Sequence, residues 1–172
     1  MRQEKGLIYS NNILRNHNIC DIMYDILYCH FGDTCMNDYL TTNEILSIAK
    51  NRFDYTFKQV PEKTDIFQGR SKEWNTATLF THKAKTYSKN FYTVILKQED
   101  ARILDMTDES ILMLRFEERT LVTLNWKVLK KYLTSVCLKS NDNKRWWELN
   151  IHTKHLEIDG IDIKIPIEYE YF

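Results

Sequence analysis

The sequence predicts an α+β fold, because its two halves favour different secondary structures. Residues up to about 89 carry helix-capping signals and apolar stripes at helical spacing, whereas residues from about 90 onward form short runs rich in β-branched and large apolar side chains. Asp159-Gly160, between two such runs, is typical of a tight hairpin turn. We expect a single domain over 1–172, with N-terminal helices packed on a C-terminal, mainly antiparallel sheet that includes one further helix.

Two helices are predicted at the start of the chain. The first covers about 19–31, where apolar residues recur at three- and four-residue spacing. The second covers about 42–53, and its start is indicated by Thr41-Thr42-Asn43-Glu44. This sequence matches a capping box, in which the residue before the helix and its third residue cap each other.

The second half predicts a series of strands interrupted by one helix over 126–138, where apolar residues return to helical spacing. The segment 139–144 is polar and is expected to be a loop. The predicted strands are 91–96, 101–106, 110–116, 120–125, 146–151, 155–158 and 161–167.

The 24 basic and 24 acidic residues cancel, so the chain is not a polycation that would attract nucleic acid over its whole surface. The apolar run Leu7-Ile8-Tyr9 is too short for a signal peptide or a membrane span. We therefore expect a cytoplasmic protein, or a nuclear one, with reduced thiols and no membrane contact. The sequence leaves the oligomeric state open, including a homodimer.

Positive charge is concentrated in residues 50–89, which contain nine Lys or Arg and four Asp or Glu. A helix is predicted over about 72–87, because Ala77, Phe80 and Ala84 recur at helical spacing. Its other side, extended to residue 89, would present cations for phosphates and polar groups for base edges. The candidate nucleic-acid-binding residues are Lys72, Asn75, Thr76, Lys83, Lys85 and Lys89. Nucleic-acid binding, with DNA as the first candidate, is therefore the leading functional hypothesis.

The order of these helices and the strands that follow resembles a winged helix-turn-helix, in which one helix enters the DNA major groove. The segment 54–71 between the second and third helices is much longer than the turn of about three or four residues in that motif. The alternative is a helix with a solvated basic side, packed on a sheet and without a nucleic-acid partner.

The C-terminal third, about 108–172, contains strands 110–116 and 120–125, a helix over 126–138 and the aromatic strand Trp146-Trp147-Glu148-Leu149. This order resembles the closing part of small type II restriction endonucleases. The resemblance implies an Mg²⁺-dependent endodeoxyribonuclease that uses an Asp followed by Asp/Glu-x-Lys. The acids would hold Mg²⁺ near the scissile phosphate, and the Lys would assist the attacking water.

The triplet Asp162-Ile163-Lys164 matches that pattern, with Glu157 or Asp159 nearby across the hairpin, so Asp162 and Lys164 are the candidate catalytic residues. The segment Lys83-Ala84-Lys85, just before the strands, has the Lys but lacks the acid. Alternating charge on a hairpin is typical of a solvated face, and the intervening isoleucines would then point to the core. We therefore expect Asp162 and Lys164 to be structural, the protein to be no enzyme, and Mg²⁺ to be needed only on the endonuclease hypothesis.

The aromatic residues of the C-terminal part suggest a partner surface. Trp146 and Trp147 are adjacent on a predicted strand, so their side chains point to opposite faces and one of them lies near the surface. Together with Tyr169 they would form a patch for a partner. The alternative function is a non-enzymatic protein-interaction module, such as a virus- or mobile-element-encoded inhibitor.

The histidines and cysteines predict no metal site. Three cysteines and a histidine within residues 20–35 lack the paired spacing of about two to four residues that zinc ligands have. His152 and His155 are three residues apart, and together with His82 they match no ligand pattern. We therefore expect no metal, no cofactor and no disulfide.

Overall fold

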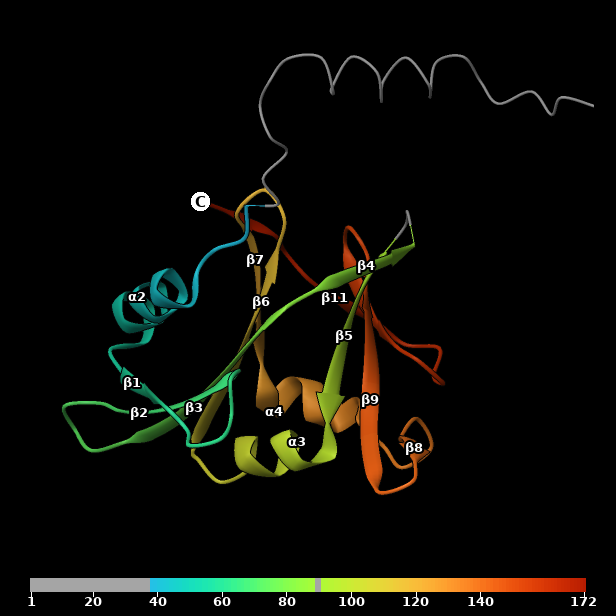
Figure 1. Cartoon of the computed structure of the whole chain (residues 1–172), viewed down its shortest axis with the longest axis horizontal. Coiled ribbons are helices and arrows are strands. Elements are labelled where there is room, and N and C mark those ends of the chain that lie inside the picture. Colours follow the sequence, from blue (N-terminus) through green and yellow to red (C-terminus); the bar gives the residue numbers. More distant parts are fainter. Residues whose placement is uncertain (1–37, 89–90) are drawn as a thin grey trace, which may run out of the picture. The chain divides into compact units, whose positions relative to one another are not determined.

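The computed structural model describes residues 38–88 and 91–172. Within these residues the chain forms two mostly antiparallel sheets and three α-helices, which confirms the expected α+β fold (Figure 1). Two of the helices lie in the second half of the chain, so the helices are not gathered on the N-terminal side as predicted. The helix predicted over 19–31 lies outside the described residues.

Sheet A contains six strands in the spatial order β1-β2-β3-β6-β7-β12. Neighbouring strands are antiparallel except β3 and β6, which run parallel. The bounds are Thr56–Gln59 for β1, Ile66–Arg70 for β2, Thr76–Lys83 for β3, Glu109–Phe116 for β6, Thr120–Asn125 for β7 and Glu170–Tyr171 for β12.

Sheet B has the order β11-β10-β9-β5-β4, and β8 pairs with the start of β9 beside this path. All of these pairs are antiparallel. The bounds are Lys85–Ser88 for β4, Phe91–Lys97 for β5, Lys139–Asn141 for β8, Lys144–Ile151 for β9, His155–Ile158 for β10 and Lys164–Pro166 for β11.

The helices are α2 (Thr42–Phe53), α3 (Gln98–Leu104) and α4 (Trp126–Leu129), which a 3₁₀ turn, η1 (Lys130–Tyr132), continues. Helices α3 and α4 lie together at one end of the sheets, where β5 and β7 end, while α2 lies beside sheet A (Figure 1). No helix among residues 38–88 and 91–172 is long and apolar enough to cross a membrane.

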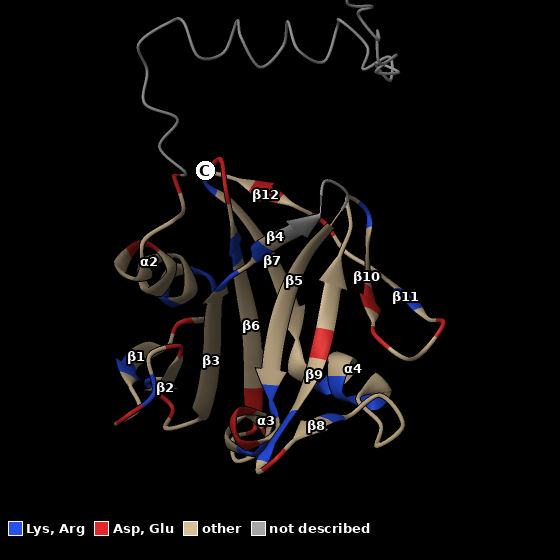
Figure 2. Cartoon of the chain, turned by 45° about the vertical axis from the view of Figure 1, so that its right-hand side comes forward, with Lys and Arg blue, Asp and Glu red and all other residues tan. Residues whose placement is uncertain are grey.

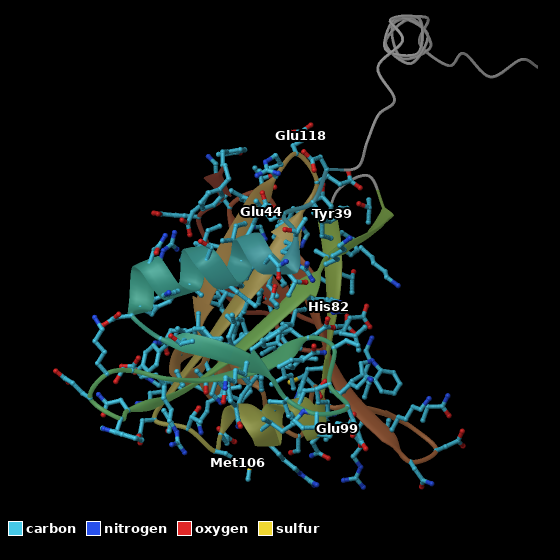
Figure 3. All side chains as sticks on the ribbon, turned by 60° about the vertical axis from the view of Figure 1, so that its left-hand side comes forward. Tyr39, Glu44, His82, Glu99, Met106 and Glu118 are labelled. Carbon is cyan, nitrogen blue, oxygen red and sulfur yellow. The ribbon has the colours of Figure 1, made fainter. Side chains whose placement is uncertain are left out.

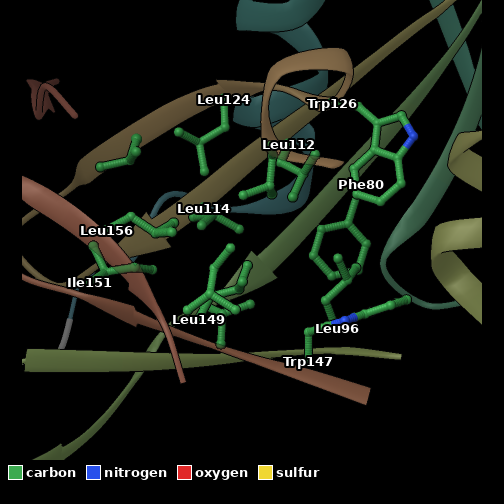
Figure 4. Packing of buried hydrophobic residues seen from close by; sticks show 14 of the residues in the cluster. Phe80, Leu96, Leu112, Leu114, Leu124, Trp126, Trp147, Leu149, Ile151 and Leu156 are labelled. Carbon is green, nitrogen blue, oxygen red and sulfur yellow. The ribbon is translucent and has the colours of Figure 1, made fainter. Parts of the chain in front are cut away.

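The two sheets enclose one apolar core (Figure 4). Because side chains alternate along a strand, every second residue points inward. Leu112 and Leu114 of β6 are fully buried there, in one cluster with Leu149 and Ile151 of β9. Trp126, at the start of α4, closes this core at the end where the short helices lie.

Helix α2 covers the opposite face of sheet A. Ile45 and Ala49 of α2 are fully buried in a second apolar cluster, which includes Ile111 and Met113 of β6. The residues that alternate with them on β6 belong to the core between the sheets. Strand β6 is therefore buried on both faces, which explains why its sequence is almost continuously apolar.

The parallel pairing of β3 with β6 requires the chain to leave sheet A and return to it. After β3 the chain forms β4 and β5 of sheet B, and α3 then leads back to β6. The two strands align from Ala77 opposite Glu109 to Lys83 opposite Arg115. The connection from β3 to β6 therefore contains two neighbouring strands of sheet B and links the two sheets covalently.

The helix predicted over about 72–87 is wrong, because these residues form the β2–β3 turn, β3 and β4. Residues 77–81 are all buried, since β3 has the inter-sheet core on one face and the α2 cluster on the other. A strand buried on both faces shows no alternation of apolar and polar residues. The spacing of Ala77, Phe80 and Ala84 therefore matched a helix without forming one.

Three other predicted elements also differ. The strand expected over 101–106 is mostly α3, in which Ala101 and Leu104 are buried at helical spacing. The helix expected over 126–138 ends at Tyr132, and the indole of Trp147 donates a hydrogen bond to the carbonyl oxygen of Thr134 at 3.0 Å. The expected loop 139–144 contains β8.

The Asp159-Gly160 hairpin is also wrong in its details. The pairing of β10 with β11 ends at Glu157 and Lys164, and residues 159–163 between the two strands form a loop and not a two-residue turn. A type I′ turn needs positive φ at both central residues, and here only Gly160 has it, at 93°. Ile163 is 39% exposed in this loop, so the expected series of buried isoleucines is broken.

The capping box of α2 is confirmed. Thr41 Oγ1 accepts a hydrogen bond from the backbone N–H of Glu44 at 3.3 Å, and the Thr41 N–H donates to Glu44 Oε2 at 2.8 Å. Arg119, in the β6–β7 turn, donates to Glu44 Oε1 at 2.6 Å (Figure 3). These hydrogen bonds, with that of Arg119 the strongest, lower the pKa of Glu44 to about 2.

We expect Glu44→Gln to remove a pH-dependent part of the stability. A Glu in an unfolded chain has a pKa of about 4.3, so the lowered pKa means that the charge of Glu44 stabilises the folded state above about pH 4.3. This contribution is lost as the pH falls through the folded-state pKa. Urea unfolding should show a lower free energy of unfolding for the variant at neutral pH, and the two proteins should converge near pH 2.

Glu118→Gln is the matched control, because Glu118 is exposed in the same turn and forms no ion pair with any described residue. It should follow the wild type at every pH. A glutamine at position 44 keeps the helix cap, so a stability loss that does not change with pH would contradict the role of the charge.

Candidate functional site

A hollow of about 1030 Å³ lies on the outer face of sheet B, the face turned away from the core. Its lining comes from β5, from the first half of β9, from α3 and from the β8–β9 turn at Asp142 and Asn143. We call this surface the sheet B hollow. The described helices leave this face open, because α2 packs on sheet A and the two shorter helices lie at the ends of the strands.

Strand alternation decides which side chains line the hollow. Val94 and Leu96 of β5 are fully buried in the core, so the residues between and beside them point outward. The antiparallel register then sets Ile95 opposite Glu148 and Lys97 opposite Trp146. Residues directly opposite each other on one face are close enough to act together.

The hollow carries net positive charge. Four of its cations, Lys97, Arg102, Lys144 and Arg145, form no ion pair within the described parts of the chain. Figure 2 shows blue segments where β5 ends and β9 begins, beside α3.

Two of the three acids that line the hollow pair with cations outside it, and the third, Asp142, forms no ion pair among the described residues. Glu99 pairs with Lys63 at 2.9 Å, and the hydrogen bond from Lys63 lowers the pKa of Glu99. Glu148 pairs with Lys139 at 2.6 Å, and hydrogen bonds to Asp159 and Glu148 raise the pKa of Lys139. The positive charge of the hollow therefore results from local pairing in a chain whose total charge is zero.

Apolar and polar groups accompany these cations. Trp146 and Phe91 are half-buried and Ile95 is 36% exposed, so rings and an aliphatic side chain reach the surface. Beside them, the Thr93 hydroxyl donates to Asn150 Oδ1 at 3.2 Å. The face can therefore stack on planar groups, attract anions and exchange hydrogen bonds.

The residues expected on a basic helix are separated in the structure. Lys72 and Asn75 are exposed in the β2–β3 turn and Thr76 begins β3, whereas Lys83 ends that strand. About 23 Å of extended strand separates Thr76 from Lys83 at about 3.3 Å per residue. The ammonium group of Lys83 lies 5.1 Å from the centre of the Tyr39 ring, so this cation has a partner within the protein.

Lys85 belongs to sheet B. It begins β4 and pairs with Thr93 of β5, so its exposed side chain shares the outer face with the hollow. Lys89 lies outside the described residues. Of the six proposed contact residues, Lys85 therefore lies on the same face as the sheet B hollow without lining it, and the four between Lys72 and Lys83 belong to the β2–β3 turn and β3 of sheet A.

Asp162 and Lys164 are exposed at the β10–β11 loop. Lys164 lies 3.6 Å from Glu157, and Asp162 forms no ion pair with any residue of 38–88 or 91–172. Asp65, between β1 and β2, is hydrogen-bonded to His82 of β3 at 2.6 Å, and both residues line a small hollow that also includes residues of β5 and α3.

The three aromatic residues expected at a partner surface have different surroundings. Trp147 is 8% exposed and faces the core, whereas Trp146 lines the hollow, as their adjacency predicted. Tyr169 is half-buried, its ring lies 5.1 Å from that of Phe116, and its hydroxyl donates to the His152 carbonyl. Burial raises the pKa of Tyr169 to about 12.

One group of side chains could hold a metal ion. His152, His155 and Glu157 gather at the β9–β10 turn, with their potential ligand atoms all within 4.8 Å of one another. His82, the other histidine considered with these two in the sequence, pairs instead with Asp65 on sheet A. The third member of this group, Glu157, was not predicted from the sequence. It lies two residues after His155, and residues at this spacing on a strand point to the same face, which could have indicated it.

The residues of the hollow could not be grouped from the sequence. The alternation in Phe91–Lys97 indicates which residues share a face, but Lys97 and Trp146 are neighbours only through strand register. No family model, characterised protein or solved structure matches the chain. The resemblance to type II restriction endonucleases therefore stays a prediction from the sequence pattern.

We expect Trp147→Ala to lower the free energy of unfolding by about 3–5 kcal/mol, the usual cost of removing a large buried aromatic side chain. The variant also leaves the Thr134 carbonyl without its indole donor. Trp146→Ala, on the neighbouring residue, should cost clearly less, because Trp146 lines the open hollow. Equal losses of stability in urea unfolding would contradict the assignment of Trp146 to the surface.

Proposed function

We propose that the protein binds single-stranded nucleic acid in the sheet B hollow. The observation that carries this proposal is the combination of the Trp146 ring with four cations that form no ion pair among the described residues: Lys97, Arg102, Lys144 and Arg145. Binding of single strands without sequence preference uses these two components, because bases stack on aromatic rings and phosphates bind cations.

A single strand suits this face better than a duplex does. The apolar side chains of Phe91, Ile95 and Trp146 would have no apolar surface to contact on a duplex backbone, whereas unpaired bases can stack on them. Duplex reading commonly inserts a helix into the major groove. The helix beside the hollow, α3, spans Gln98–Leu104, only about 10 Å at 1.5 Å per residue.

The face also offers room for a strand longer than the hollow. Lys85 on β4 extends the cations across the sheet, and Thr93 and Asn150 provide polar groups between them and the far strands. Sheets that bind RNA in this way stack two or three bases on their surface and leave the phosphates to basic residues at the edge.

The proposal contains no hydrolytic step. The endonuclease hypothesis needs Asp162 and Lys164 to hold Mg²⁺ and activate water in a concave, partly enclosed site. Both side chains are exposed, and the nearest acid to Lys164, Glu157, is engaged with two histidines.

A protein partner is the second candidate, and one observation favours it. Tyr171 is 76% exposed and Phe172 is 48% exposed at the C-terminal end. Tyr171 also lines a hollow of about 300 Å³ together with the acids Glu117 and Glu118. An exposed aromatic group next to acids suits a basic peptide better than nucleic acid.

We expect salt-sensitive binding of labelled oligo-dT or oligo-U, measured by fluorescence anisotropy. Each phosphate contact of a single strand contributes about −0.7 to the slope of the logarithm of the association constant against the logarithm of the salt concentration. Four cations should therefore give a slope of about −3. Arg102→Glu combined with Arg145→Glu should weaken binding by about tenfold or more. Trp146→Ala should cost about 1–3 kcal/mol of binding free energy through lost stacking.

The matched control is Lys50→Glu combined with Lys58→Glu, which makes the same charge change on α2 and β1 of the sheet A side. It should leave the affinity nearly unchanged. Equal weakening by both pairs would show that the hollow is not the binding surface. Absence of binding at micromolar protein would reject the nucleic-acid proposal and leave Tyr171→Ala, tested against basic peptides, as the next experiment.

A further inference from the structure

We propose that His152, His155 and Glu157 form a binding site for a late divalent transition-metal ion, with Zn²⁺ as the best fit. The three residues surround the β9–β10 turn on the outer face of sheet B, at the other end of β9 from the sheet B hollow. None of the three ligands lines that hollow, although Phe91, whose ring lies beside His152, does. Metal binding can therefore be tested separately from nucleic-acid binding.

The donor atoms are spaced as ligands of one small ion. His155 Nε2 lies 2.9 Å from Glu157 Oε1, and His152 Nε2 lies 3.3 Å from Glu157 Oε2. Zn²⁺ binds nitrogen and oxygen at about 2.0–2.1 Å, which requires neighbouring donors to be about 2.9–3.4 Å apart in octahedral or tetrahedral geometry. Each histidine nitrogen lies at such a distance from a different oxygen of Glu157, and the potential ligand atoms all lie within 4.8 Å of one another.

The backbone that carries the ligands is held from two sides. The His152 N–H donates to the His155 carbonyl at 2.9 Å and closes the turn. The C-terminal segment supports it from outside, since Tyr169 Oη donates to the His152 carbonyl at 3.3 Å and the Ile167 N–H donates to the Lys154 carbonyl at 3.2 Å. A ligand set fixed in advance loses little conformational entropy when it binds an ion.

The two imidazole rings pack against each other and against Phe91. The imidazoles of His152 and His155 are stacked, with centroids 4.6 Å apart and an angle of 13° between their planes. The ring of Phe91 lies 5.3 Å from that of His152 and covers one side of it. The nitrogen lone pairs of stacked rings are nearly parallel, so at least one of the two imidazoles turns about its side-chain bonds when both bind the same ion.

The chemistry of the donors selects the ion. Two imidazoles and one carboxylate suit Zn²⁺, Co²⁺ or Fe²⁺, whereas Mg²⁺ prefers oxygen ligands only. This ligand set is distinct from the Mg²⁺ centre that the endonuclease resemblance implies.

The ion would keep a coordination position open to solvent. The three side chains are 25%, 27% and 33% exposed, so the described part of the chain leaves each of them partly accessible to solvent. Three protein ligands and one open position are typical of catalytic rather than structural zinc sites. Water or an anionic group of a ligand could therefore occupy the fourth position.

A bare His–carboxylate cluster is the competing explanation, and the protein contains its own comparison. His82 Nδ1 pairs with Asp65 Oδ2 at 2.6 Å, with similar exposure, but no second histidine joins this pair within the described residues. If the cluster at the β9–β10 turn were only a hydrogen-bonding arrangement, then neither this cluster nor the His82–Asp65 pair would retain an ion.

The test is Co²⁺ titration of the tag-free, full-length protein after treatment with a chelator. We expect stoichiometric binding with visible d–d absorption bands, displaced by Zn²⁺ and unaffected by excess Mg²⁺. The bands should disappear in His155→Ala and in Glu157→Gln, and persist in the matched control His82→Asn. Circular dichroism melts of each variant show that the fold is retained, and Glu157→Gln keeps the shape of the side chain if His155→Ala melts early.

Lys164→Gln provides a second test, in which the substitution is expected to strengthen Co²⁺ binding and not to abolish it. The ammonium group of Lys164 lies 3.6 Å from Glu157 and repels a cation bound there. Its removal should tighten Co²⁺ binding by up to about tenfold at low ionic strength, and less at high salt.

Three results would overturn the proposal. The first is the absence of bands at millimolar Co²⁺, and the second is binding that survives both His155→Ala and Glu157→Gln. The third is a near-ultraviolet thiolate-to-metal absorption, which would attribute the ion to cysteines, since Co²⁺ bound by imidazole and carboxylate lacks such a band.

Discussion

Burial of β6 on both faces is the constraint on which the rest of the structure depends. Ile111 and Met113 face the α2 cluster, and Leu112 and Leu114 belong to the core between the sheets. Neither face of sheet A can therefore be exposed to solvent, and each face needs its own covering layer. It needs helix α2 outside and sheet B inside, which produces the three layers of the fold.

Arg115, near the end of the same strand, shows how strict this burial is. Its side chain is 6% exposed, and burial lowers its pKa from the ordinary value. Its Nη1 donates at 3.3 Å to both the Leu40 carbonyl and Thr42 Oγ1, which ties β6 to the start of α2, while Nε has no partner among the described residues. A buried cation with neutral acceptors costs free energy and is retained here at the junction of sheet and helix.

The crossover between β3 and β6 also decides where a ligand can bind. It commits β4 and β5 to sheet B, and α3 then returns the chain at the end of the strands, not across the face of the sheet. The outer face of sheet B is thus left uncovered within the described parts of the chain. Both the sheet B hollow and the cluster of His152, His155 and Glu157 lie on this face. Its positive charge arises because Lys63 and Lys139 neutralise two of the acids while the neighbouring cations keep their charge.

The sequence alone determined the elements whose signals are local. The capping box at Thr41 and Glu44 fixed the start of α2, and the runs 91–96, 110–116 and 120–125 became β5, β6 and β7 almost unchanged. These predictions succeeded because capping, β-branched composition and turn chemistry act between residues close in the chain. The prediction for 72–87 failed because a strand buried on both faces loses the alternation that distinguishes it from a buried helix.

Only the tertiary structure decided the candidate sites. Lys97 meets Trp146, and His155 meets Glu157 and His152, through strand register and through a turn closed by backbone hydrogen bonds. Register depends on contacts between residues far apart in sequence, and a shift of one residue would turn each of these side chains to the opposite face. The amino-acid sequence thus set which residues lie on each strand face, and the packing of the sheets set which of them act together.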